Sequence, residues 1–366
     1  MATDNSTPGS EPGIGRTLRD DLLNTDLRKS IRRDFKELEE LMLDEDRQGK
    51  LRTMSQVNRW LHSAWWLTRS VFLRLTPSRR LLVVLGIIFL FIRPQGRDPG
   101  MNLDILGGLI FFFVLMLELK DKLIARNELQ SGHAVQEALL PPRSPAVPGW
   151  DIWLYSRPAN EVGGDLMDFM QTEETAFRVA VGDVAGKGLK AALLTAKLQA
   201  TLRALVMDFH SFDALAARLN QIFCRDSLPN IFASLIFLEI RPDTGTVRLI
   251  NAGHFPPLLV SRTTVTRAER GGMALGLSPD ATFTEQHLDL RQGDLILIYS
   301  DGLIEARNEE EKFYGDERLL ALIRKSGSLA AAQIGEMLVA DVDLFAGEAK
   351  KQDDLTIALL RRTGSP

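Results

Sequence analysis

The feature that most constrains the fold of this chain is a change of sequence pattern near residue 145. Before it, apolar residues recur mainly at helical spacing or in long runs, and after Pro148 short β-rich segments alternate with helical stretches. At 366 residues the chain is too long for one typical domain and suits two, or one domain with a regulatory arm. We therefore expect a helical N-terminal part and a mixed α and β domain over residues 143–366.

Composition excludes several classes of function. The formal net charge of -4 gives no electrostatic case for a nucleic-acid partner. Because Cys224 is the single cysteine, the chain has no disulfide framework and no thiolate metal site. None of the five histidines follows another at a spacing of four residues, which argues against a zinc enzyme of the usual kind.

The first 78 residues divide into a polar tail and a helical region. Residues 1–15 are rich in Gly, Pro, Ser and Thr and lack the order of a signal peptide, so we expect a disordered tail. Residues 16–78 have helical periodicity, and their second half carries tryptophans among arginines. This pattern fits a small helical bundle or a dimer face, and it fits equally a helix at a membrane surface.

Residues 79–118 contain two apolar runs, Leu81–Ile92 and Ile105–Leu117. Each is shorter than the ~20 residues that span a bilayer. Their pairing across a short Pro/Gly turn, the flanking basic residues and the tryptophans upstream favour a short membrane hairpin. The alternative is a soluble apolar hairpin. The first interpretation predicts an inner-membrane protein with a cytoplasmic catalytic domain, and the second a cytoplasmic protein.

Residues 119–142 form the predicted linker. They are typical of one continuous helix that ends at Pro141-Pro142, and they keep no strict heptad. Because this helix joins the hairpin to the C-terminal domain, we hypothesise that it transmits a membrane or dimerisation signal. The N-terminal and linker helices are also the candidates for a homodimer contact.

Acidic residues mark strand ends in the C-terminal domain. Asp165 follows two glycines, and Asp183 lies between a predicted strand and a glycine-rich turn. Asp301 follows the apolar strand 294–299, and Asp353 and Asp354 precede the strand 357–360. Singly, each fits an ordinary turn or cap aspartate. Together, converging carboxylates are costly without cations, and hard oxygen ligands suit Mg²⁺ or Mn²⁺. Two such ions could hold a water molecule and stabilise a phosphoryl transition state.

Five ordered motifs carry a family resemblance. They are EVGGDLMDF (161–169), VGDVAGKG (181–188), NAGHFPPLL (251–259), LILIYSDGLIEA (295–306) and QDDLTIALL (352–360). Together they resemble the metal-dependent protein phosphatases of the 2C type, and specifically the bacterial branch typified by stage II sporulation protein E and the sigma-B regulatory phosphatases. The resemblance extends from Val135 to Arg361. It implies an α+β fold, a four-layer αββα sandwich with two metal ions at one edge.

The resemblance also implies roles for individual residues. Asp183 would bridge the two ions, with the main-chain carbonyl of Val184 as a further ligand. Asp301 and Asp353 would complete the shell of one ion, and Asp165 would hold the other, directly or through water. The catalytic set is then Asp165, Asp183 and Asp301.

Some positions remain open or depart from the family pattern. Asp354 is an alternative ligand to its neighbour, and we favour Asp353. Eukaryotic members carry a histidine where this chain has Ala185, which leaves the general acid unassigned. His254 could contact substrate or a loop, but we favour a turn histidine held by the backbone. Lys187 could contact phosphate, but we favour a solvated loop lysine.

The leading functional hypothesis is a protein serine/threonine phosphatase. The resemblance implies attack by a water held by two metal ions on a phosphorylated regulatory protein, such as an anti-sigma-factor antagonist. The alternatives are a membrane-tethered pseudophosphatase that serves as a scaffold or sensor, and a hydrolase of a small phosphate ester. The sequence identifies neither the protein substrate nor the input signal.

Overall fold

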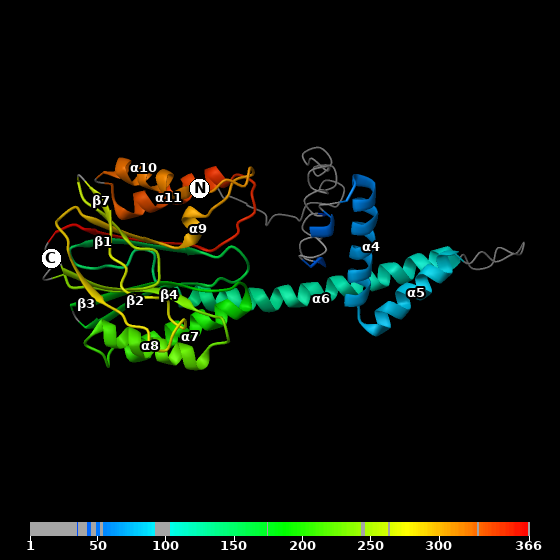
Figure 1. Ribbon diagram of the computed structural model, residues 1–366, viewed down its shortest axis with the longest axis horizontal. Coiled ribbons are helices and arrows are strands. Elements are labelled where there is room, and N and C mark those ends of the chain that lie inside the picture. Colours follow the sequence, from blue (N-terminus) through cyan, green and yellow to red (C-terminus); the bar gives the residue numbers. More distant parts are fainter. Residues whose placement is uncertain are drawn as a thin grey trace, which may run out of the picture. The chain divides into compact units, whose positions relative to one another are not determined.

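The computed structural model describes residues 54–91, 103–173, 175–242, 246–262, 264–327 and 329–364, with a few isolated positions before residue 54 (Figure 1). The chain divides into two compact units, residues 1–122 and 123–366. The predicted tail, most of the helical pattern before residue 54 and the turn between the two apolar runs lie outside the described residues.

The described part of the first unit is helical, as predicted. It contains α4 (Gln56–Arg74), α5 (Pro77–Phe91) and the beginning of α6 (Leu103–Leu139). The two apolar runs pack closely where Gly86 of α5 meets Gly107 of α6, since a Cβ atom added at Gly107 would lie 2.8 Å from the Gly86 carbonyl oxygen. At the other end of the pair, the Arg79 guanidinium bonds Glu118 at 2.6 Å and Asp121 at 2.5 Å. The predicted apolar hairpin is therefore a pair of packed helices.

The membrane-spanning form of this hairpin is not confirmed. Within the described ranges, no helix has both the length and the apolar character that crossing a bilayer requires. The helix α5 has 15 residues, which corresponds to about 22 Å of helix. The helix α6 does not stop at the predicted boundary near residue 118 but continues without a break through the predicted linker.

The second unit contains two five-stranded antiparallel sheets. The first has the order β1-β10-β9-β6-β7, formed by β1 (Trp150–Arg157), β10 (Leu355–Arg362), β9 (Leu295–Tyr299), β6 (Leu258–Val260) and β7 (Val265–Arg267). The second has the order β2-β3-β4-β5-β8, formed by β2 (Asp165–Glu173), β3 (Ala176–Val184), β4 (Ala233–Ile240), β5 (Thr246–Ala252) and β8 (Glu285–Asp289).

Helices cover the outer face of each sheet (Figure 1). The helices α7 (Leu189–Leu205) and α8 (Phe212–Asp226) pack on the second sheet. The helices α10 (Gly315–Ser326) and α11 (Ala331–Ala346) pack on the first. A third apolar core lies between the two sheets. The predicted four-layer αββα sandwich is confirmed.

Two central strands fix the position of the candidate site. All five residues of β9 are buried, and only the last residue of β10 is partly exposed. Their continuous apolar sequences reflect this, because each strand has a packed layer on both faces. The short helix α9 (Asp301–Ile304) begins two residues after β9 ends. Side chains at the ends of these strands are thus held by a rigid core.

Candidate metal and active site

The structure brings the five predicted acids to one end of the sandwich. Asp165 and Asp183 lie directly opposite each other on β2 and β3 of the second sheet. Asp301 is the first residue of α9, and Asp353 and Asp354 come just before β10, the neighbour of β9 in the first sheet. All five side chains line a single pocket of about 270 Å³ between the two sheets.

The glycine pair before Asp165 makes this close approach feasible. A Cβ atom at Gly163 would lie 2.5 Å from Oδ2 of Asp354. A Cβ atom at Gly164 would lie 2.9 Å from the Val184 carbonyl oxygen and 3.2 Å from Oδ1 of Asp183. Any larger residue would displace the carboxylates, so the sequence Gly-Gly-Asp is a steric requirement of the site.

Asp353 and Asp354 have different environments. The Asp354 carboxylate accepts main-chain hydrogen bonds from Ala159 at 2.7 Å, Gly164 at 2.6 Å and Asp165 at 3.3 Å. Asp353 forms an ion pair with Lys187 at 3.1 Å, and its side chain is 38% exposed. Because the oxygens of Asp354 already hold two loops together, Asp353 has more freedom to bind a cation.

The electrostatics of the pocket disfavour the carboxylates in their charged form. Burial raises the pKa of Asp165 well above its usual value, and Asp183 and Asp354 raise it further. Burial and the neighbouring carboxylates, Asp301 first among them, raise the pKa of Asp183 to about 7. Burial and the charge of Asp353 raise the pKa of Asp301 to about 6. Lys187 is the one cationic side chain among the described residues that line the pocket.

The donor set fits divalent cations by its chemistry. Carboxylate and carbonyl oxygens are the ligands that Mg²⁺ and Mn²⁺ prefer. Oδ2 of Asp165 is buried and has no hydrogen-bond partner, which is costly unless a cation or water satisfies it. Among the described residues, no three acidic, histidine or cysteine side chains are already arranged as a metal centre.

Two other predicted positions are loop residues that differ in burial. The His254 main-chain N–H donates to Asn251 at 2.8 Å, and its Nδ1 lies 2.7 Å from the Ser234 hydroxyl. Burial lowers the pKa of His254 to about 4, so the ring is neutral at pH 7. Its interpretation as a turn histidine is confirmed. The interpretation of Lys187 as a solvated loop lysine is also confirmed, because its side chain is 61% exposed. Its ammonium donates to the Gln352 carbonyl at 2.7 Å.

Gln136 of α6 is a contact that the sequence interpretation missed. Its amide nitrogen donates to the Gly163 carbonyl at 2.9 Å, and its amide oxygen accepts from the Gly163 N–H at 3.1 Å. The end of α6 thus holds the loop that carries Asp165. A half-buried glutamine on a helix gives no distinctive signal in sequence. The spacing of His133, Gln136 and Leu140 on one helical face is the pattern that could have indicated a contact.

Comparisons with known proteins agree with this fold. The sequence matches the family model described as stage II sporulation protein E (SpoIIE) over residues 173–363, which is more than half of the chain. The SiaA-PP2C domain of Pseudomonas aeruginosa superposes with a TM-score of 0.58 at 19% identity, covering 66% of this chain and 98% of that domain. At this identity the structural likeness shows the fold alone.

Two curated relatives are similar in sequence. Protein IcfG of Synechocystis is 26% identical over 273 residues, which cover 67% of this chain and 43% of IcfG. Phosphoserine phosphatase RsbU of Bacillus subtilis is 27% identical over 239 residues, which cover 65% of this chain and 70% of RsbU. The chain thus spans less than half the length of the first relative. From the family model that covers more than half of its length, this chain belongs to the stage II sporulation protein E family.

Proposed function

We propose that this protein is a metal-dependent protein serine/threonine phosphatase. The observation that carries the proposal is the convergence of five carboxylates from two sheets on one pocket with a single lysine to balance them. Burial and mutual repulsion raise the pKa of Asp165, Asp183 and Asp301, as expected for a cation-binding centre before it is loaded. The similarity to RsbU, which is named a phosphoserine phosphatase, supports the same class of reaction.

In this proposal, Asp183 and the Val184 carbonyl would contribute ligands to two cations. Asp301 and Asp353 would help to hold one cation, and Asp165 the other. When bound, two Mg²⁺ or Mn²⁺ ions would neutralise charge on the phosphoryl group and lower the pKa of the attacking water. Hydrolysis would transfer the phosphoryl group to water and release the serine or threonine hydroxyl, without a covalent enzyme intermediate.

The proposed substrate is a phosphorylated regulatory protein of the anti-sigma-factor-antagonist kind. The five motifs shared with the sigma-B regulatory phosphatases support this assignment. The pocket opens between loops at the edge of the sandwich and its described lining contains one aromatic residue, Phe232. A site of this kind suits a phosphorylated side chain presented by a protein surface.

We further propose that the first unit associates with the inner membrane and leaves the catalytic domain in the cytoplasm. Residues 56–91 contain five arginines and no acidic residue. Large apolar side chains of this unit are exposed, among them Trp60 at 65%, Leu81 at 72% and Phe91 at 81%. Basic segments with exposed tryptophan are typical of membrane interfaces. A homodimer through the N-terminal and linker helices would cover the same side chains.

The deciding assay is phosphate release from a phosphoprotein by the full-length chain in detergent, with Mn²⁺ or Mg²⁺. We expect metal-dependent turnover that Asp183→Asn and Asp301→Asn both abolish. A folded wild type that binds Mn²⁺ but shows no turnover on any phosphoprotein would favour the pseudophosphatase scaffold. Turnover of small phosphate esters alone would favour the small-ester hydrolase.

The membrane and linker proposals need a separate comparison. Full-length protein should float with anionic liposomes, whereas a chain that lacks residues 1–118 should not. A full-length protein that is dimeric in solution and ignores liposomes would instead assign the apolar side chains to the dimer. If the truncated chain keeps both its activity and its response to partners, the linker does not transmit a signal.

A further inference from the structure

A groove of about 750 Å³ lies at the other end of the sandwich from the carboxylates. The loop that joins β6 to β7, the end of α10 and the last turn before β9 form its walls. Its described lining includes Arg262, Arg324 and Arg361, and none of these described residues is acidic. It also includes three hydroxyl-bearing side chains, namely Ser261, Thr264 and Thr266.

The groove is separate from the candidate active site. The two pockets share no lining residue. The strand β10 begins next to Asp354 and reaches Arg361 seven residues later, a span of about 23 Å at the usual rise of a strand. A ligand in the groove would therefore not touch the carboxylates.

Arg361 is a buried cation that forms no ion pair with a carboxylate of the described residues. It is 7% exposed, and its two terminal nitrogens donate to the carbonyls of Gly293 at 3.2 Å and Gly327 at 3.1 Å. Within the same described ranges its Nε has no hydrogen-bond partner. Burial lowers the pKa of Arg361, and Asp151 offsets this only in part. An uncompensated cation of this kind favours an anion in contact with it.

Arg262 and Arg324 are free to bind an anion. In the part of the chain that the structure describes, neither side chain makes a hydrogen bond or ion pair. By contrast, Arg203 bonds Asp168 and Arg318 bonds Asp341 elsewhere in the same unit. Arg324 alone could be explained by the negative end of the α10 dipole. That explanation does not cover Arg262 and Arg361, which come from other segments.

We propose that this groove is a second binding site, specific for a phosphate-bearing small molecule of the nucleoside-triphosphate kind. Guanidinium groups recognise phosphate oxygens through paired hydrogen bonds, and the hydroxyls supply further donors. The aliphatic side chains of Val260, Val265 and Ile323 give the groove an apolar wall that suits a base and sugar. This assignment does not depend on the proposed phosphatase activity.

Isothermal titration of the full-length protein with ATP in EDTA tests the proposal. EDTA keeps the carboxylate pocket free of metal, so that pocket repels the triphosphate. We expect saturable binding of one ATP per chain, weakened by higher salt. The double variant Arg262→Gln/Arg324→Gln should bind at least about tenfold more weakly, since it loses charged hydrogen bonds. Arg218→Gln, an exposed arginine of α8, is the matched control and should bind like wild type.

Titration with inorganic pyrophosphate distinguishes a nucleotide ligand from an inorganic polyphosphate ligand. Tighter binding of ATP than of pyrophosphate supports a nucleotide ligand. Equal affinity supports phosphate recognition with an inorganic polyphosphate as ligand. Failure of both to bind, or equal binding by the double variant and wild type, overturns the proposal. The two variant positions are exposed, so unchanged denaturation midpoints will exclude a folding defect as the cause.

Discussion

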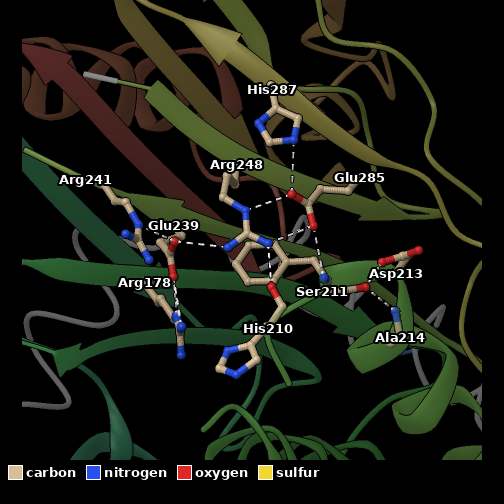
Figure 2. Close-up of polar contacts among 11 residues, drawn as sticks. Arg178, His210, Ser211, Asp213, Ala214, Glu239, Arg241, Arg248, Glu285 and His287 are labelled. Atoms are coloured by element: carbon tan, nitrogen blue, oxygen red, sulfur yellow. Dashed lines mark hydrogen bonds and ion pairs between the residues drawn. The ribbon is translucent and has the colours of Figure 1, made fainter. Parts of the chain in front are cut away.

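Two groups of buried acids in the second unit have opposite electrostatic environments. Glu239 on β4 is fully buried and contacts three arginines (Figure 2). Arg178 bonds its Oε2 at 2.8 Å, while Arg241 at 3.0 Å and Arg248 at 3.3 Å bond its Oε1. Burial acts to raise the pKa of Glu239, but the bonds from Arg241 and Arg178 outweigh it and leave the pKa lowered.

The network around Glu239 also ties secondary structure together. The Arg248 guanidinium lies over the Phe212 ring, 4.3 Å from its centroid. It also bonds Glu285 at 2.7 and 2.9 Å (Figure 2). The Glu285 carboxylate in turn accepts a hydrogen bond from the main-chain N–H of Phe212, the first residue of α8. These contacts join α8 to the second sheet, which is a structural role.

Among the described residues that line their pocket, the carboxylates at the end of the sandwich have no arginine and only Lys187 as a cation. The pKa values of Asp165, Asp183 and Asp301 are raised where that of Glu239 is lowered, although burial acts to raise the pKa of all four. The chain supplies arginines where a buried acid stabilises the fold, and omits them where the acid must bind an external cation. Buried acids are therefore functional candidates only after their partners have been identified.

The largest expected effect is on catalysis. Asp183→Asn should lower metal-dependent phosphate release by about 10³-fold, since the central ligand of the site loses its charge. The same change removes like-charge repulsion, so the metal-free protein should unfold at an equal or higher denaturant concentration. A clear fall in its denaturation midpoint in EDTA would contradict the distinction between the two groups of acids.

The largest expected effect on stability is at Glu239. Glu239→Gln keeps the shape but leaves the buried Arg178 without its counter-charge, and should lower the free energy of unfolding by about 3–5 kcal/mol. Urea denaturation measures the change. Glu336→Gln, at an exposed position of α11, is the control and should have almost no effect. A loss below about 1 kcal/mol at Glu239 would mean that its network is not structural.

His254 is a buried titratable residue without a charged partner among the described residues, and the pH dependence of the free energy of unfolding tests the effect of its burial. Its folded-state pKa of about 4 lies below the usual value of about 6.5, so protonation favours the unfolded chain. As the pH falls from 6.5 to 4, this residue should lower the free energy of unfolding by up to about 3 kcal/mol. Urea denaturation at several pH values gives the difference in free energy of unfolding between wild type and His254→Asn, which isolates the contribution of His254. A difference that does not vary with pH would contradict the predicted destabilisation.

The smallest expected effect separates Asp353 from Asp354. Asp354→Asn would turn an amide nitrogen toward main-chain N–H groups and should cost about 1–2 kcal/mol of stability. Asp353→Asn should leave stability within about 1 kcal/mol of wild type, because its ion pair with Lys187 is exposed, but should reduce Mn²⁺-dependent turnover. Full turnover by Asp353→Asn, with turnover lost in Asp354→Asn, would assign the ligand to Asp354.

The sequence predicted the parts of the fold that local pattern controls. The apolar runs of β9 and β10, the helical face of α8 and the glycines beside Asp165 are visible in order along the chain. The acids at strand ends are also visible in the sequence. A strand that is buried on both faces must be apolar throughout, so the first polar residue beside it marks the end of the buried strand. Local pattern also separates α10 from α11, because Gly327 follows the last residue of α10 with a φ of +49°.

Only the tertiary structure decided which residues meet. It placed Asp165 opposite Asp183, gave Asp354 its main-chain donors, paired Lys187 with Asp353 and brought Gln136 to Gly163. It also gathered Arg262, Arg324 and Arg361 from three segments around one groove. The residues that bear the chemistry can be read from the sequence, since their types and spacing are local. Their partners lie up to 195 residues away, so only the packing of the sheets determines whether a buried charge is compensated or left for a ligand.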